Sequence, residues 1–129
     1  MTDEARAKAK VVIADDDDDI RRLVQITVSN AGCDVTPTAD GESALEAIRR
    51  IKPDLVILDV LMPRMDGWEV AKELKKDPAT EAIPIMFLTS KGQEHDVLEG
   101  FEAGGLDYVV KPFSPRELQA RIRSLLAKR

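Results

Sequence analysis

Four short apolar runs impose the strongest constraint on the fold of this 129-residue chain. The runs read VVIA, LVIL, IMFL and YVV and lie at residues 11–14, 55–58, 85–88 and 108–110. Each is too short for a helix and is apolar at nearly every position, as in strands that are buried on both faces of a parallel sheet. The sequence therefore predicts a parallel sheet with helices on both sides.

A fifth and weaker strand is expected around Val35, where the segment CDVTP alternates between apolar and polar residues. Alternation is typical of a strand that is only partly covered, so we place this strand at the edge of the sheet. Because proline cannot donate a hydrogen bond to the ladder, we expect Pro37 to end it.

Between the strands, the apolar residues recur with the period of a helix. Three helical stripes are predicted in this way: Ile20, Leu23, Val24 and Val28; Ala44, Ala47, Ile48 and Ile51; and Leu118, Ile122, Leu125 and Leu126. Two capping-box patterns mark helix starts: Asp66 with Glu69, and Ser114 with Pro115 and Glu117. The pattern predicts five strands alternating with five helices. The fold class is α/β, a flavodoxin-like doubly wound five-stranded parallel sheet in the order 2-1-3-4-5.

Charge and cysteine content argue against several kinds of function. With 19 basic and 24 acidic residues the formal charge is −5, which argues against direct nucleic-acid binding and favours proteins or cations as partners. Cys33 is the only cysteine, so neither an internal disulfide nor a cysteine zinc cluster can form. The charged start MTDEARAKAK and the shortness of the apolar runs predict no signal peptide, no membrane segment and a cytoplasmic location.

Polar residues follow the predicted strands at their carboxyl ends: Asp15, Asp16, Asp59, Thr89 and Lys111. In a 2-1-3-4-5 sheet the first and third strands are neighbours, so Asp15, Asp16 and Asp59 should converge at the edge where such folds bind ligands. Three close carboxylates repel one another unless a cation lies between them. A hard divalent ion fits this set, so we expect Mg²⁺, with Mn²⁺ as a second candidate, and Lys111 beside it as a fixed positive charge for an anion.

The five consecutive aspartates are compatible with two other roles. Helix capping and interaction with the helix dipole are the expected roles of Asp18 and Asp19. A calcium-binding EF-hand loop is excluded, because Ile20 and Ile26 occupy the places that require glycine and glutamate.

Four motifs in order together resemble the receiver domain of two-component response regulators. They are VVIADDDDDIRRLV, PDLVILDVLMPRMDGWEV, IPIMFLTSKG and GGLDYVVKPFSPREL. The resemblance covers nearly the whole chain, so we expect a receiver domain over residues 10–129 after an N-terminal extension over residues 1–9.

The resemblance implies roles for individual residues. Asp59 would accept a phosphoryl group from a sensor histidine kinase or a histidine phosphotransfer protein. Asp16, Asp59 and the backbone carbonyl of Leu61 would bind magnesium directly, and Asp15 mainly through water. Lys111 would contact the phosphoryl group, and a cis peptide is implied between Lys111 and Pro112.

Further implications concern signalling. Thr89 and Tyr108 would form a switch pair that reshapes the surface of the fourth helix, fifth strand and fifth helix, where a downstream protein binds. Asp107 and Arg121 match part of a pattern for phosphorylation-dependent dimers, from which Val97 and Leu106 depart. Leu61 and Lys91, two residues beyond Asp59 and Thr89, predict slow loss of the phosphoryl group to water, since neither can orient that water.

The sequence is compatible with three functions. The leading one is a stand-alone signalling receiver that is not an enzyme acting on another substrate. The second is the receiver portion of a longer DNA-binding transcriptional regulator. The third is a haloacid-dehalogenase-like phosphatase, which requires a second aspartate where this chain has Leu61.

Overall fold

The computed structural model describes residues 8–90 and 107–127. Its strands are β1 (Lys10–Ala14), β2 (Asp34–Thr38), β3 (Leu55–Asp59), β4 (Ile85–Ser90) and β5 (Asp107–Lys111). Its helices are α1 (Asp18–Asn30), α2 (Gly41–Ile51), α3 (Gly67–Lys76) and α5 (Pro115–Leu126). The described ranges thus hold four of the five expected helices; the remaining one was expected between β4 and β5, in residues 91–106, which lie outside the described residues.

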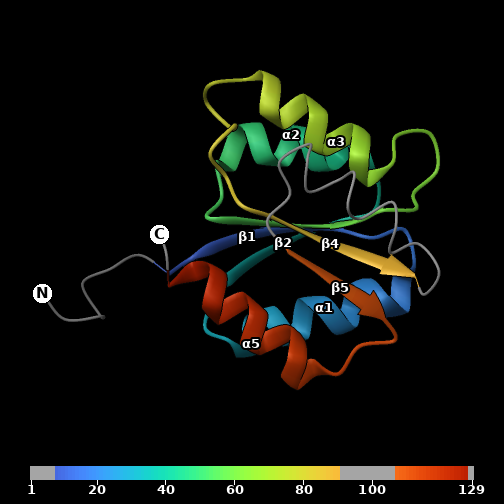
Figure 1. Ribbon diagram of the computed structural model, residues 1–129, viewed down its shortest axis with the longest axis vertical. Helices are drawn as coiled ribbons and strands as arrows, with labels where there is room; N and C mark the ends of the chain where they lie inside the picture. Colours follow the sequence, from blue (N-terminus) through green and yellow to red (C-terminus); the bar gives the residue numbers. More distant parts are fainter. Residues whose placement is uncertain (1–7, 91–106, 128–129) are drawn as a thin grey trace, which may run out of the picture.

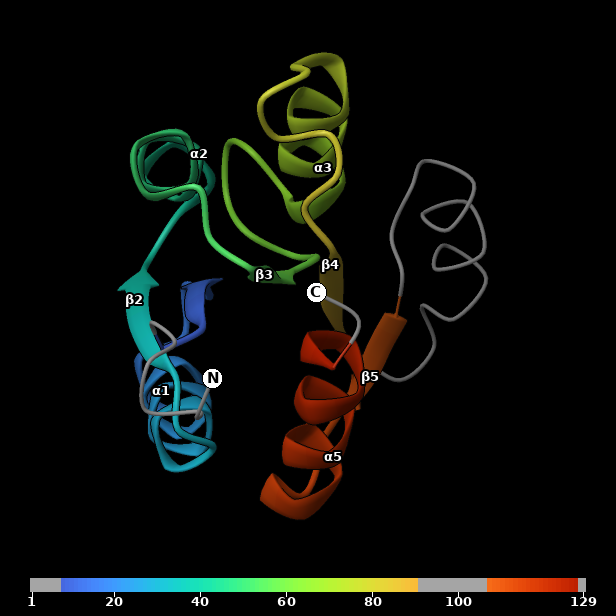
Figure 2. The same cartoon turned by 90° about the vertical axis from the view of Figure 1, so that its left-hand side faces the viewer.

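The five strands form one parallel sheet in the order β2-β1-β3-β4-β5, which confirms the predicted topology. Helices α2 and α3 cover one face of the sheet and α1 and α5 cover the other (Figures 1 and 2). Strand β3 lies in the middle of the sheet, with β1 and β4 as its neighbours. The fold is therefore the doubly wound α/β sandwich, in which the carboxyl ends of β1 and β3 meet at one edge.

Two apolar clusters fill the spaces between the sheet and the helix layers. Because successive strand residues point to opposite faces, Val56 and Leu58 join the cluster under α2 and α3, whereas Leu55 and Ile57 join the cluster over α1 and α5. All four side chains have 0% relative exposure. The continuous apolar run thus reflects a strand that is buried on both faces.

Two predictions about the elements were wrong. Strand β2 does not end at Pro37: it continues to Thr38, with Pro37 opposite Ile13. An edge strand tolerates proline where the missing N–H would have pointed away from the sheet. Leu23 was expected on the buried stripe of α1 but is 36% exposed, because the buried part of this helix is centred on Val24, Thr27 and Val28.

The predicted helix starts are largely confirmed, with one correction in the aspartate run. Asp66 and Glu69 form a complete capping box at α3, and Ser114 caps α5 with Pro115 in its first turn. The N-cap of α1 is Asp17, whose carboxylate accepts hydrogen bonds from the amides of Asp19 and Ile20, rather than Asp18 or Asp19 as expected. Asp18 and Asp19 lie in the first turn, where they still favour the helix dipole.

Candidate functional site

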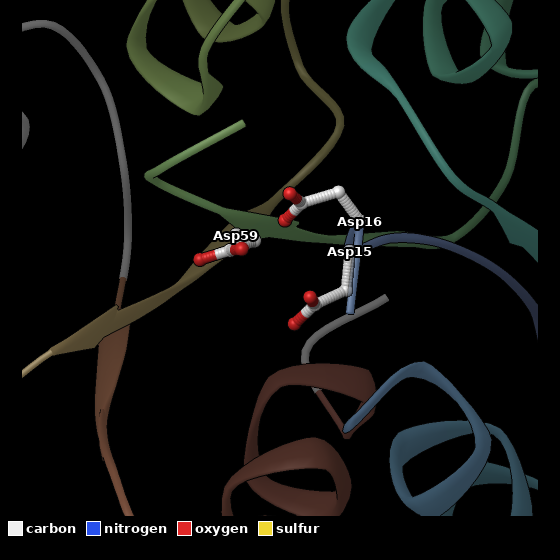
Figure 3. Close-up of side chains that lie close together, drawn as sticks. All are labelled: Asp15, Asp16 and Asp59. Carbon is white, nitrogen blue, oxygen red and sulfur yellow. The ribbon is translucent and has the colours of Figure 1, made fainter. Parts of the chain in front are cut away.

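Three carboxylates gather at the carboxyl edge of the sheet. Asp15 and Asp16 follow β1, and Asp59 is the last residue of β3, the strand that pairs with β1. One carboxylate oxygen from each of the three lies within 4.8 Å of the others. Asp15 and Asp59 are buried, whereas Asp16 is exposed. Figure 3 shows how the three side chains gather at this edge. The predicted convergence of the three aspartates is therefore confirmed.

Asp15 is held by hydrogen bonds at its backbone and its side chain. Its amide donates to the carbonyl of Thr38 at 3.2 Å, and its own carbonyl accepts from Arg21 Nη1 at 3.0 Å. Its carboxylate accepts from the Asp17 amide at 2.9 Å through Oδ1 and from Lys111 Nζ at 3.0 Å through Oδ2. Asp15 is thus a fixed, buried part of the site.

Lys111, the last residue of β5, reaches both buried carboxylates. Its Nζ lies 3.0 Å from Asp15 Oδ2 and 3.2 Å from Asp59 Oδ1. Burial disfavours its charged form, but the attraction of Asp59 and Asp15 outweighs this, so the pKa of Lys111 is raised. The ammonium group therefore stays protonated and provides a permanent positive charge between the two acids.

Asp59 is the group of the site whose pKa is shifted most clearly. Burial, followed by repulsion from Asp15, raises its pKa from 3.8 to about 7, although Lys111 and a backbone hydrogen bond from Leu61 act in the opposite direction. The single positive charge of Lys111 thus does not neutralise the pair of buried acids.

This donor set fits a hard divalent cation. Three carboxylates within reach of one ion supply the oxygen ligands that Mg²⁺ prefers. Burial and repulsion from Asp15 raise the pKa of Asp59, so its charged form is disfavoured here, and a cation would favour that form. The exposure of Asp16 leaves the site open to solvent on one side, as an ion that keeps several waters requires.

The other predicted site residues lie nearby on β4 and β5. Asp59 pairs in register with Leu88, so buried Thr89 is the next residue along the neighbouring strand. Tyr108, half-buried at the start of β5, packs against the cluster under α2 and α3. Leu61 follows β3 with its side chain 56% exposed. The Lys111–Pro112 peptide is cis, as predicted.

The structure also shows contacts that the sequence did not reveal. Arg21 donates to the Asp15 carbonyl and forms an ion pair with Asp18, both from the first turns of α1. Farther from the site, Arg121 Nη1 lies 2.7 Å from Asp107 Oδ1 within the same chain.

The predicted positions Lys91, Val97 and Leu106 lie outside the described residues. Among the helices in the described part of the chain, none has the length and apolarity needed to cross a membrane.

Comparisons with known proteins agree with this geometry. The sequence model of the response regulator receiver domain matches residues 11–123. The chain therefore belongs to the response regulator receiver domain family, which is a family of signalling domains.

Solved structures share the fold over nearly the whole chain. A putative response regulator from Chloroflexus aurantiacus has a TM-score of 0.88 at 39% identity, covering 94% of this chain and 99% of its own. The chemotaxis response regulator CheY4 of Vibrio cholerae has a TM-score of 0.86 at 34% identity, covering 92% of this chain and 99% of its own.

Curated relatives are longer proteins. The probable transcriptional regulator ycf27 of Cyanophora paradoxa is 48% identical over 94% of this chain, and this match covers 49% of the relative. The alkaline phosphatase synthesis transcriptional regulatory protein PhoP of Bacillus subtilis is 42% identical over 92% of this chain, again covering 49% of the relative. The chain thus spans about half the length of these relatives.

Proposed function

We propose that this receiver accepts a phosphoryl group on Asp59, in a Mg²⁺-dependent reaction, from a phosphohistidine of a sensor histidine kinase or histidine phosphotransfer protein. The observation that carries this proposal is the position of Lys111 Nζ, 3.2 Å from Asp59 and 3.0 Å from Asp15, beside the three converging carboxylates. A cation and a lysine around one buried carboxylate form a pocket suited to an incoming phosphoryl anion.

In the proposed transfer, a carboxylate oxygen of Asp59 forms a bond to phosphorus while the phosphorus–nitrogen bond of the donor breaks. The electron pair of that bond stays on the departing imidazole, which then takes a proton from solvent. Lys111 stabilises negative charge on the phosphoryl oxygens, and Asp15 keeps the ammonium group in place. Mg²⁺ bound by Asp15, Asp16, Asp59 and the Leu61 carbonyl would supply further charge stabilisation and orientation.

Signal output is proposed to use Thr89 and Tyr108. Thr89 lies on the strand next to Asp59, and Tyr108 is paired in register with Phe87, two residues before Thr89. A hydroxyl drawn to the phosphoryl group would bias the position of the Tyr108 ring, and with it the surface around β5 and α5 that a downstream protein recognises. A cytoplasmic location and a phosphorylation-dependent dimer stay predictions from the sequence.

Phosphorylation with acetyl phosphate in Mg²⁺ tests the proposed acceptor. We expect wild-type protein to gain one phosphoryl group, found by mass spectrometry on the peptide that contains Asp59, and Asp59→Asn to gain none. Asp19→Asn, which alters an exposed aspartate of α1, is the matched control and should be labelled like wild type. Full labelling of Asp59→Asn would assign the acceptor to another residue.

The lifetime of the phosphoryl group is expected to be long. Leu61 offers no hydrogen-bond donor or acceptor in its exposed side chain, so it cannot align a water for attack on phosphorus. Leu61→Asn should therefore lose the phosphoryl group faster than wild type after the donor is removed. An equal decay rate would show that Leu61 does not set the lifetime.

The names of the curated relatives support a second candidate role. If this receiver is part of a longer transcriptional regulator, phosphorylation would control a separate DNA-binding region rather than contact DNA through this acidic chain. Sequencing the gene beyond the codon for Arg129 distinguishes the two roles: a following DNA-binding region supports the regulator, and a stop codon supports the stand-alone receiver.

A further inference from the structure

Arg21 holds the peptide group that directly precedes Asp16. From α1, its Nη1 donates to the carbonyl oxygen of Asp15 at 3.0 Å. Its Nη2 forms an ion pair with Asp18, whose own side chain is 81% exposed. The Arg21 side chain is only 23% exposed, so its guanidinium lies against the loop between β1 and α1. Arg21 thus ties this loop to the first turn of the helix.

The two peptide groups on either side of Asp16 are both restrained. The carbonyl before Asp16 accepts from Arg21, and the amide after it, which belongs to Asp17, donates to Asp15 Oδ1 at 2.9 Å. Asp16 itself is exposed, and its carboxylate extends beside those of Asp15 and Asp59 (Figure 3). The two restrained peptide groups therefore fix the backbone of Asp16, and with it the direction in which its side chain leaves the loop.

We propose that Arg21 is a positioning residue, which orients the Asp15–Asp16 peptide so that the Asp16 carboxylate faces the divalent cation. This inference rests on the proposed function, because it assumes that the three aspartates bind the cation. Arginine suits the role because its planar guanidinium carries separate donors for the carbonyl and for Asp18, whereas lysine offers one compact ammonium group.

The sign of the effect separates positioning from simple electrostatics. Arg21 carries a positive charge near a site for a cation, so removing only its charge should strengthen cation binding. Removing a group that orients a metal ligand through a hydrogen bond should instead weaken cation binding. A weaker affinity after the loss of a nearby positive charge would therefore not be explained by charge alone.

The test is a calorimetric titration of the full chain and four variants with Mn²⁺. Arg21→Met removes the donors and the charge but keeps a long side chain, and we expect it to weaken Mn²⁺ binding about tenfold. Arg21→Lys should bind more weakly than wild type but more tightly than Arg21→Met. Arg22→Met is the matched control, because it removes the same charge from the adjacent, exposed position and should bind at least as tightly as wild type.

Arg21→Met binding as tightly as wild type, or Arg22→Met losing as much affinity, would overturn the positioning role. Melting in chelator checks that the variants are folded; if Arg21→Met is not, Arg21→Lys decides, with equal or tighter binding than wild type contradicting the proposal. Titrations of wild-type protein and of Asp16→Asn test the cation site separately from the role of Arg21. No Mn²⁺ binding by wild type, or equal binding by Asp16→Asn, would refute the cation site itself.

Discussion

The interior of the sheet and its carboxyl edge differ completely in chemistry, although they adjoin within a single strand. Leu58 is fully buried among apolar side chains, and the next residue, Asp59, faces another buried acid and a lysine. The interior gains free energy from apolar burial. The edge places like charges close together, which disfavours the folded state unless a cation binds. Loss of a buried apolar side chain should therefore lower stability, whereas neutralisation of the buried Asp59 should raise it.

The largest expected effect is in the interior. Ile57→Ala removes a fully buried side chain from β3 and should lower the free energy of unfolding by about 2–5 kcal/mol, measured by denaturant unfolding in chelator. Ile26→Ala makes the same substitution at a position that is 52% exposed and should change stability by less than about 1 kcal/mol. Similar losses for both would mean that burial in the sheet does not determine stability.

A smaller effect is expected where α3 packs against the end of β3. A Cβ atom on Gly67 would lie 2.5 Å from the backbone oxygen of Asp59, so Gly67→Ala should cost about 1–3 kcal/mol and also weaken Mn²⁺ binding by shifting Asp59. Gly32→Ala is the control: Gly32 has φ +87° with no atom within 4 Å of the added Cβ. This variant should lose stability through backbone strain but keep its Mn²⁺ affinity. Unchanged Mn²⁺ affinity of Gly67→Ala would show that the close packing of α3 against β3 does not control the position of Asp59.

At the carboxyl edge, replacing Asp59 should raise stability rather than lower it, and the size of this effect should depend on pH. The pKa of Asp59 is raised to about 7 from 3.8, so between these values the folded protein keeps a proton that the unfolded chain releases. Wild-type stability in chelator should therefore fall as the pH rises from about 4 to 7. Asp59→Asn lacks this loss, so its advantage in melting temperature over wild type should grow by several °C over the same range. A constant difference from pH 5 to pH 8 would argue against the raised pKa.

The smallest effect on stability is expected at Asp16, the exposed member of the site. Asp16→Asn should change the unfolding free energy in chelator by no more than about 0.5 kcal/mol. Its effect on cation affinity should be much larger: a unit charge at ~4 Å from a divalent ion contributes ~2 kcal/mol even in water, or roughly thirtyfold. Calorimetric titration with Mn²⁺ measures this, and a large loss of stability would instead assign Asp16 a structural role.

Most of the fold could be predicted because its signals are local. The apolar runs of β1, β3 and β4 and the Asp66–Glu69 capping box depend on neighbouring residues alone. The convergence of the aspartates followed from strand order, since parallel neighbours end at the same edge.

The details that could not be predicted depend on tertiary geometry. In a run of identical aspartates, the capping role of Asp17 depends on where β1 ends and α1 begins, which the run itself does not mark. Proline in a strand is acceptable only if its missing N–H faces outward, which the sequence around Pro37 does not reveal. The Arg21 contact with the Asp15 carbonyl involves a backbone atom, so no residue pattern indicates it.

The most direct test of the central claim is a comparison of melting temperatures at pH 8, in chelator and in saturating Mg²⁺, for wild type and Asp59→Asn. In chelator the variant should melt higher, because it avoids the cost of burying the charged Asp59 carboxylate and its repulsion from Asp15. In Mg²⁺ the order should reverse, since an ion that binds only the folded state at a hundred times its dissociation constant adds about 2.7 kcal/mol, and wild type binds it more tightly. If one protein melts higher under both conditions, the account is contradicted, because Asp59 then does not both lower the stability of the metal-free protein and strengthen cation binding.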